Sequence, residues 1–239
     1  MSVNTSNHLD NRSGEEGNVL FLILVAVVLF AALSYAVTRT SSNNSGTVDN
    51  EKDKIAAAQM IQYPAGLRST ILRMEIGGTS AEDLRFDSPA DFTNLSNLSV
   101  LVFHPQGGGG TFVQSPPDLM AGEVSGNWYF NAEFEIENLG LNHGGQDIGN
   151  DIVAFLPGVK RGICMSVNED LGVGSIPQVS ADVSGAYMMQ MIDGYSFPAG
   201  EVILGTAGAN GSDLLTGQPF GCFQNSTGEY VYYHVLADR

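Results

Sequence analysis

Two cysteines, Cys164 and Cys222, carry the most specific side-chain chemistry in this sequence, and the chain has no others. Both follow a long apolar run near the N-terminus, so a membrane crossing by that run would leave them on one side. Thiols that reach an oxidising compartment commonly pair as disulfides. A bridge closing so long a loop stabilises a fold by roughly 4 kcal/mol in the chain-entropy description. We expect a disulfide, and two separate buried thiols are the alternative.

The histidines do not form a metal-binding pattern. His8, His104, His143 and His234 stand far apart, and none has a cysteine or a pair of carboxylates at ligand spacing. The sequence contains no Gly-x-Ser-x-Gly, Ser-x-x-Lys, His-Glu-x-x-His or Gly-Lys phosphate loop, and the glycines of 205–211 have the wrong spacing for dinucleotide binding. We therefore expect no catalytic residue, no cofactor, no metal ligand and no enzymatic activity.

One loop offers oxygen atoms that a calcium ion would accept. Residues 147–151 read Asp-Ile-Gly-Asn-Asp, which does not follow the EF-hand order. Loops rich in Asp and Asn usually form turns, because these side chains bond to their own backbone. A turn is the expected interpretation, and calcium binding at 147–151 is left open.

The charge balance bears on the kind of partner. The chain has 26 Asp and Glu against 10 Lys and Arg, which gives a formal net charge of −16. Such an acidic chain repels phosphate backbones, so we expect no nucleic-acid partner. Lys160 and Arg161 are the only basic residues between Arg85 and Arg239. They could contact an acidic partner, and ordinary surface pairing is the alternative.

A helix is predicted from Asp49 or Asn50 to the glycine pair at 77–78. Its apolar residues recur every three or four positions along one face, and Pro64 should kink or split it. The stripe, expected to be core, consists of Ala57, Met60, Ile61, Leu67, Ile71 and Met74. A second helix is expected where Val159, Ile163, Val167 and Leu171 follow at steps of four and Gly172 ends the run.

Strand patterns dominate the rest of the chain. Residues 128–137 alternate between apolar and polar, so one face should be core and the face with three glutamates should be solvated. Residues 151–156 and the aromatic run 230–236 are further strand candidates. Residues 99–103 and 111–113 could form a hairpin around a mobile loop of four glycines.

The predicted helices and strands are preceded by an apolar run near the N-terminus. Residues 19–37 carry no charge, and as a helix they would be about 29 Å long, close to the hydrocarbon thickness of a bilayer. A helix buried in a soluble core and a secretory signal cleaved near 34–36 are the alternatives. Residues 39–50 are polar and poor helix formers, which predicts a flexible tether.

The string from Gly14 to Asn18, followed at once by the apolar run, resembles the start of a type IV prepilin or type II secretion pseudopilin. In that family a prepilin peptidase cuts a hydrophilic leader after a glycine, and the apolar helix anchors the subunit and later packs in the filament core. The resemblance implies that Gly17 ends the leader and that Asn18 is the new N-terminus. Leu22 stands where major pilins carry Glu, which suits an initiating or accessory subunit.

Together these patterns predict an α+β protein with a leader at 1–17, a transmembrane or filament-core helix at 18–38, a tether at 39–50 and an exported domain at 51–239. In that domain a helix should pack on an antiparallel sheet. The resemblance implies a pilin-like or minor pseudopilin-like subunit of the inner membrane, with a periplasmic or extracellular C-terminal domain. Its partners would be the membrane, other pilin-like subunits and the prepilin peptidase. The alternative is a single-pass anchored protein whose exported domain binds a ligand or partner.

Overall fold

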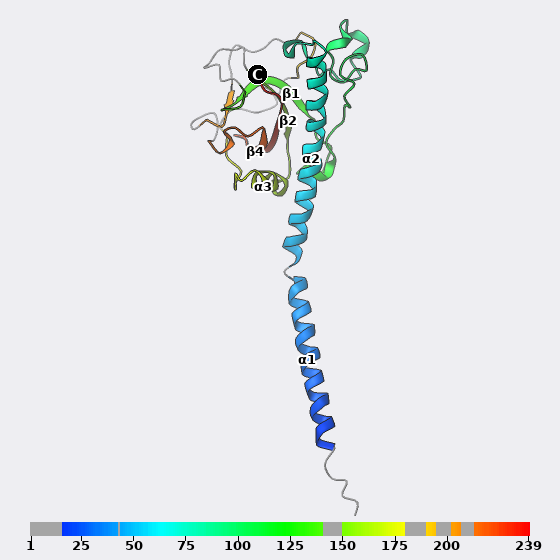
Figure 1. The fold of residues 1–239 in the computed structure, drawn as a ribbon, viewed down its shortest axis with the longest axis vertical. Coiled ribbons are helices and arrows are strands. Elements are labelled where there is room, and N and C mark those ends of the chain that lie inside the picture. The colour runs from blue at the N-terminus through cyan, green and yellow to red at the C-terminus, as the bar shows by residue number, and fades with distance from the viewer. Residues whose placement is uncertain (1–15, 43, 141–149, 180–189, 195–201, 207–212) are drawn as a thin grey trace, which may run out of the picture. The chain divides into compact units, whose positions relative to one another are not determined.

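The structure, a computed structural model, describes residues 16–42, 44–140, 150–179, 190–194, 202–206 and 213–239 (Figure 1). Within the two N-terminal helices, side chains are described for 19–35 and from 49 onward. The chain forms two units, residues 1–49 and residues 50–239.

The first unit is dominated by helix α1 (Glu16–Ser42) of 27 residues. Among the residues that the structure describes, no helix has both the length and the apolarity required to span a membrane. Helix α2 (Asn44–Ile76) follows, so the expected tether at 39–50 is helical on both sides of residue 43, which lies outside the described residues. Extending an existing helix costs less free energy than starting a new one, so residues with low helix propensity can continue the helices on either side.

The second unit is an α+β domain, as predicted, built on one five-stranded sheet. Its strands have the order β3-β1-β2-β5-β4. The sheet is mixed rather than antiparallel, because β3 pairs parallel with β1 while the other pairs are antiparallel. The elements are β1 (Tyr129–Ile136), β2 (Asp151–Pro157), α3 (Arg161–Asp170), β3 (Val202–Leu204), β4 (Phe220–Gln224) and β5 (Tyr230–Ala237).

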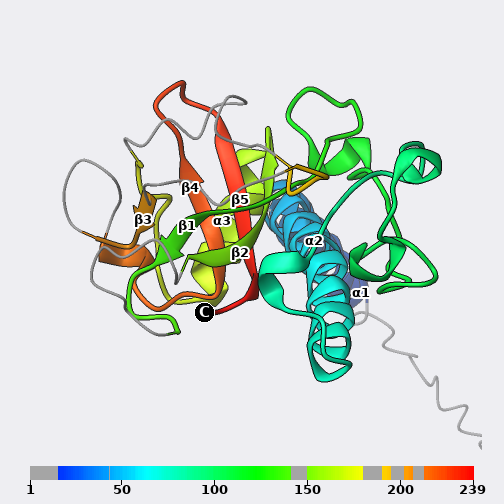
Figure 2. The ribbon, with the colours of Figure 1, turned by 90° about the horizontal axis from the view of Figure 1, so that it is seen from above.

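Helices α2 and α3 cover one face of this sheet (Figure 2). The predicted stripe of α2 is buried at all positions except Ile61, which is half-buried. Pro64 is itself buried and does not split the helix. Helix α3 buries Ile163 and Val167 against the same core, and it ends before Gly172, whose φ of 75° is the left-handed conformation expected there.

Strand β1 carries an irregularity that the alternating sequence does not reveal. Its register with β2 shifts between Asn131 and Phe134, so one extra residue is inserted. A one-residue shift moves every following side chain to the other face of a sheet. Phe130 therefore packs in the core under the helices, whereas Phe134 packs in a second core on the opposite face.

The second core corrects the prediction of a solvated face. Leu204, Leu215 and Val179 cover this face from outside the central strands. Glu135 is 5% exposed, and Glu133 is half-buried with a pKa that burial raises. The glutamates of β1 therefore do not form a solvated row, because both faces of the sheet are covered.

The glycine-rich loop, residues 107–110, packs tightly and does not join a hairpin. Its four backbone N–H groups donate to carbonyls of Leu101, Val102 and His104. A Cβ on Gly108 would lie 2.4 Å from the Val102 carbonyl oxygen and 2.8 Å from Met74 Sδ. The glycines therefore allow the backbone to approach the last turns of α2.

Two glycine substitutions should have opposite effects on stability. Gly108→Ala should lower the free energy of unfolding by about 1–3 kcal/mol or more, because its Cβ meets backbone that is hydrogen-bonded on both sides. Gly66→Ala, at an exposed position of α2, should raise the free energy of unfolding by about 0.5–1 kcal/mol, because nothing lies within 4 Å of the added Cβ. Urea denaturation of the two variants beside the wild type checks both signs. A Gly108→Ala variant as stable as Gly66→Ala would contradict the packing of this loop.

Candidate functional site

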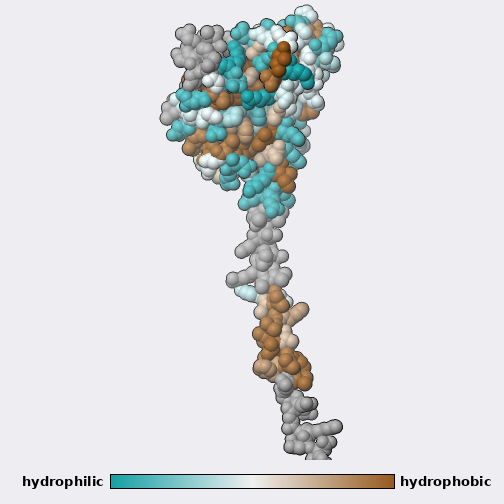
Figure 3. Space-filling view, viewed as in Figure 1, coloured by the Kyte–Doolittle hydropathy of each residue, from teal (hydrophilic) through white to brown (hydrophobic). Residues whose placement is uncertain are grey.

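Helix α1 presents exposed apolar side chains, which form the brown surface on the face of this helix seen in Figure 3. Every described side chain from Val19 to Tyr35 is exposed, and most are large and apolar. The residues of the expected processing site, Gly17 and Asn18, belong to this helix, and their side chains lie outside the described set. An apolar helix exposed on every side is stable only where lipid or protein covers it.

The predicted disulfide between Cys164 and Cys222 is present and joins α3 to β4. Asn168, one turn further along α3, reinforces this junction. Its side-chain nitrogen donates to the Cys222 carbonyl and its oxygen accepts from the Cys222 N–H, both at 2.9 Å. Strand β4 lies at an edge of the sheet, and the buried amide of Asn168 satisfies backbone groups that an edge strand leaves free.

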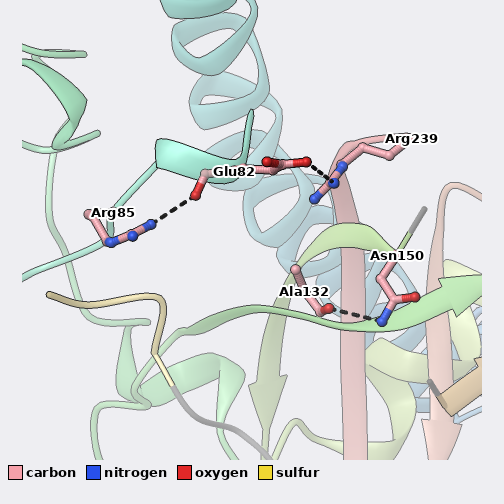
Figure 4. A network of polar contacts seen from close by, with 5 residues as sticks. All are labelled: Glu82, Arg85, Ala132, Asn150 and Arg239. Carbon is pink, nitrogen blue, oxygen red and sulfur yellow. Dashed lines mark hydrogen bonds and ion pairs between the residues drawn. The ribbon is translucent and has the colours of Figure 1, made fainter. Parts of the chain in front are cut away.

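A second buried polar group, Asp151, fixes the C-terminus of the chain. It is 0% exposed, and its two carboxylate oxygens accept from the N–H groups of Ile136, at 2.9 Å, and Arg239, at 3.2 Å. The Arg239 side chain reaches Glu82 at 3.4 Å (Figure 4). Burial is the main cause that raises the pKa of Asp151 to about 6, although both backbone donors act in the opposite direction.

The hydrogen bonds of Asp151 and Asn150 reduce the number of oxygen atoms that residues 147–151 could offer to a calcium ion. Both oxygens of Asp151 already accept backbone hydrogen bonds, and Asn150 donates from its side chain to the Ala132 carbonyl at 3.1 Å (Figure 4). Asp151 therefore serves the fold, while 147–149 lie outside the described residues. Across the described part of the chain, no three His, Cys, Asp or Glu side chains are grouped so that they could hold a metal ion.

The two described histidines both pack against aromatic rings. His104 contacts Phe92 edge to face, with ring centroids 4.8 Å apart. His234 on β5 stacks on Phe220 and shares a 2.8 Å hydrogen bond between its Nδ1 and the Tyr232 hydroxyl. Burial, with a smaller contribution from nearby Arg68, lowers the pKa of His234 to about 4.

Sequence reasoning missed the roles of Asn168, Asp151 and His234. A signal existed for the first, because Asn168 follows Cys164 by one helical turn and so shares its face. Asp151 stood in a loop pattern that suggested a turn, and nothing local indicated that Ile136 and Arg239 would converge on it.

Comparisons with protein-family models, with curated proteins and with solved structures found no match to this chain.

Asp151 and His234 should shape the pH dependence of stability in opposite directions. The raised pKa of Asp151 means that its contribution to stability falls as pH rises from about 4 to about 6. The lowered pKa of His234 means that its contribution is full above about 6.5 and is lost as pH falls toward about 4. Each amounts to about 3 kcal/mol at 1.36 kcal/mol per pKa unit, so the two largely offset one another.

Urea denaturation at several pH values separates the two groups. Asp151→Asn should leave a free energy of unfolding that rises between about pH 4 and 6.5, because Asp151 then no longer offsets the His234 contribution. His234→Gln should leave one that falls over the same interval. Parallel pH profiles for the two variants and the wild type would show that neither group titrates as its burial implies.

Proposed function

We propose that this protein is a pilin-like subunit of the minor pseudopilin kind, which is anchored in the inner membrane by residues 18–38 and assembles into a filament or a secretion or adhesion machine. The α+β domain would then lie on the periplasmic or extracellular side. The observation that carries the proposal is the apolar surface of α1, exposed on all sides from Val19 to Tyr35.

The exposed apolar surface of α1 requires an apolar covering. Apolar surface is favoured in any apolar environment, by about 25 cal/mol per Å² removed from water. Lipid tails and a bundle of like helices both supply such an environment, so a helix without charge can pass from one to the other at little solvation cost. The uncharged run in the sequence extends from Val19 to Val37, which suits both environments.

The disulfide supports an exported domain. Such bonds persist in oxidising compartments and are rare in the reducing cytosol. The bond between Cys164 and Cys222 joins α3 to the edge strand β4, and both cysteines are 0% exposed. An exported structural subunit uses such a bond to hold its fold outside the cell interior.

N-terminal sequencing of the protein from native membranes tests the proposal. A chain that begins at Asn18 supports a pilin-like subunit, because prepilin processing removes the leader and retains the helix. A start near Tyr35 or Val37 would indicate a cleaved secretory signal and contradict it. A full-length chain would favour the alternative, a permanently anchored protein whose domain binds a ligand or partner.

Gly17→Leu should block processing, because a side chain at this position obstructs the close backbone approach that a glycine permits. Gly14→Leu is the matched control, since it adds the same side chain three residues upstream and should leave processing intact. Normal processing of the Gly17→Leu variant would contradict cleavage after Gly17, and with it the resemblance to prepilins.

A further inference from the structure

A small pocket lined by three carboxylates lies between the segment that follows α2 and Asp193, within the second unit. It encloses about 130 Å³, several times the volume of a water molecule in the liquid, which is about 30 Å³. Asp87 is 5% exposed, whereas Asp83 and Asp193 are exposed, so Asp87 is the deepest of the three. The lining is completed by Arg85, Leu95, Ser96, Asn97, Val100 and Leu101.

Backbone hydrogen bonds hold the walls of this pocket together. The N–H of Arg85 donates to the Val100 carbonyl at 3.0 Å, and the N–H of Phe86 donates to the Met191 carbonyl at 2.6 Å. The Phe86 side chain is buried and stacks on Phe130, with ring centroids 4.7 Å apart. The pocket is therefore anchored to the core under the helices, although its walls come from distant parts of the sequence.

The carboxyl group of Asp87 is only partly satisfied. Its Oδ1 atom accepts from the N–H of Asp193 at 3.3 Å, and its Oδ2 atom has no hydrogen-bond partner among the described residues. Burial is the main cause that raises the pKa of Asp87; the Asp193 N–H opposes this effect, and the charges of Asp193 and Asp91 add to it. A buried carboxylate without a cation is costly, so a cation bound here would stabilise the pocket.

The cation in the lining does not meet this need. Nη1 of Arg85 donates to the backbone carbonyls of Glu82, at 3.0 Å, and Leu84, at 2.8 Å; Figure 4 shows the first of these bonds. None of the three carboxylates in the pocket forms an ion pair with a residue that the structure describes. The missing cation would therefore come from outside the described part of the chain.

The lining favours an ammonium group over other cations. A guanidinium group pairs best with two free oxygens of one carboxylate, and Asp87 has only Oδ2 free. An ammonium is compact and can donate to a single oxygen. A metal ion is disfavoured, because no three His, Cys, Asp or Glu side chains in the described residues are grouped to hold one. Leu95, Val100 and Leu101 offer apolar contact to an attached alkyl chain.

We propose that this pocket binds the ammonium group of a primary alkylamine, with Asp87 Oδ2 as its principal acceptor. Asp83 and Asp193 would attract the cation at the opening, and the apolar part of the lining would cover its methylene groups. The amine is either a free small molecule or the side chain of a lysine in another protein, since both carry the same group. The site lies within the second unit and does not depend on the proposed function.

Equilibrium dialysis of the full-length protein in a mild detergent, with radiolabelled n-butylamine, tests this site. At about pH 7 the amine is protonated, and saturable binding of one molecule per chain is expected. Asp87→Asn should weaken binding at least about tenfold, because it removes a charged acceptor. Asp193→Asn should weaken it about two- to fivefold, because this carboxylate is exposed. Asp170→Asn removes an exposed charge outside the lining and should leave binding unchanged.

Wild-type protein that binds no n-butylamine would overturn the proposal, and so would equal binding by the wild type and Asp193→Asn. The latter comparison holds even if Asp87→Asn fails to fold, because residue 193 is exposed. Displacement of the label by n-butanol as readily as by unlabelled n-butylamine would also overturn it, since n-butanol has the apolar chain without the charge. Tighter binding of CaCl₂ or n-butylguanidinium than of n-butylamine would assign the pocket to another cation.

A further competitor distinguishes the two sources of the ammonium group. Nα-acetyl-lysine methylamide reproduces a lysine side chain within a polypeptide. If it displaces the label at least as well as n-butylamine does, the site is open to a lysine of another protein. If only n-butylamine displaces the label, the ligand is a free small amine. Either result supports an ammonium site, provided that Asp87→Asn weakens the binding.

Discussion

The central strand of the sheet, β2, must be covered on both faces, and most features of the domain follow from this requirement. Six of its seven residues are buried. Together with its neighbours β1 and β5, β2 contributes side chains to two separate cores, one on each face of the sheet. The helices α2 and α3 cover one face. The other face is covered by short segments of low regularity, which include Leu204 and Leu215. The one-residue shift in β1 allows a single strand to supply aromatic side chains to both cores.

Double coverage also explains the buried polar groups. A sheet with no solvated face brings backbone and side-chain polar atoms into the interior, where each needs a partner. Asn168 provides partners for the edge strand at Cys222, and Asp151 provides them for Ile136 and the C-terminal residue. These residues are structural, and their perturbed surroundings alone do not make them catalytic.

The sequence was most informative where a local pattern repeats. The apolar stripe of α2, the strands β2 and β5, and helix α3 with its terminal glycine were all predictable, because periodicity and capping are local properties. The disulfide was predictable from cysteine number and the inferred compartment. The bulge in β1 was not, because its alternating residues fit an unbroken strand equally well. The role of Gly108 and the parallel pairing of β3 depend on contacts with distant segments, which no local pattern records.

The same reasoning links the two units to one proposed function. The second unit buries most of its apolar residues in its two cores, whereas every described apolar residue of α1 is exposed, so this helix depends on its surroundings. Under the proposed function, a lipid bilayer would meet that need for a single subunit, and neighbouring helices would meet it in a filament.

The most direct test of this account is disulfide crosslinking along α1 in native membranes. Single cysteines would be placed at successive positions from Val19 to Leu33, and the native cysteines would not interfere because they pair with each other. The account predicts crosslinked dimers and higher oligomers at positions that recur about every 3.6 residues, as expected for helices packed side by side. A membrane-bound protein that forms no crosslink at any of these positions would contradict it.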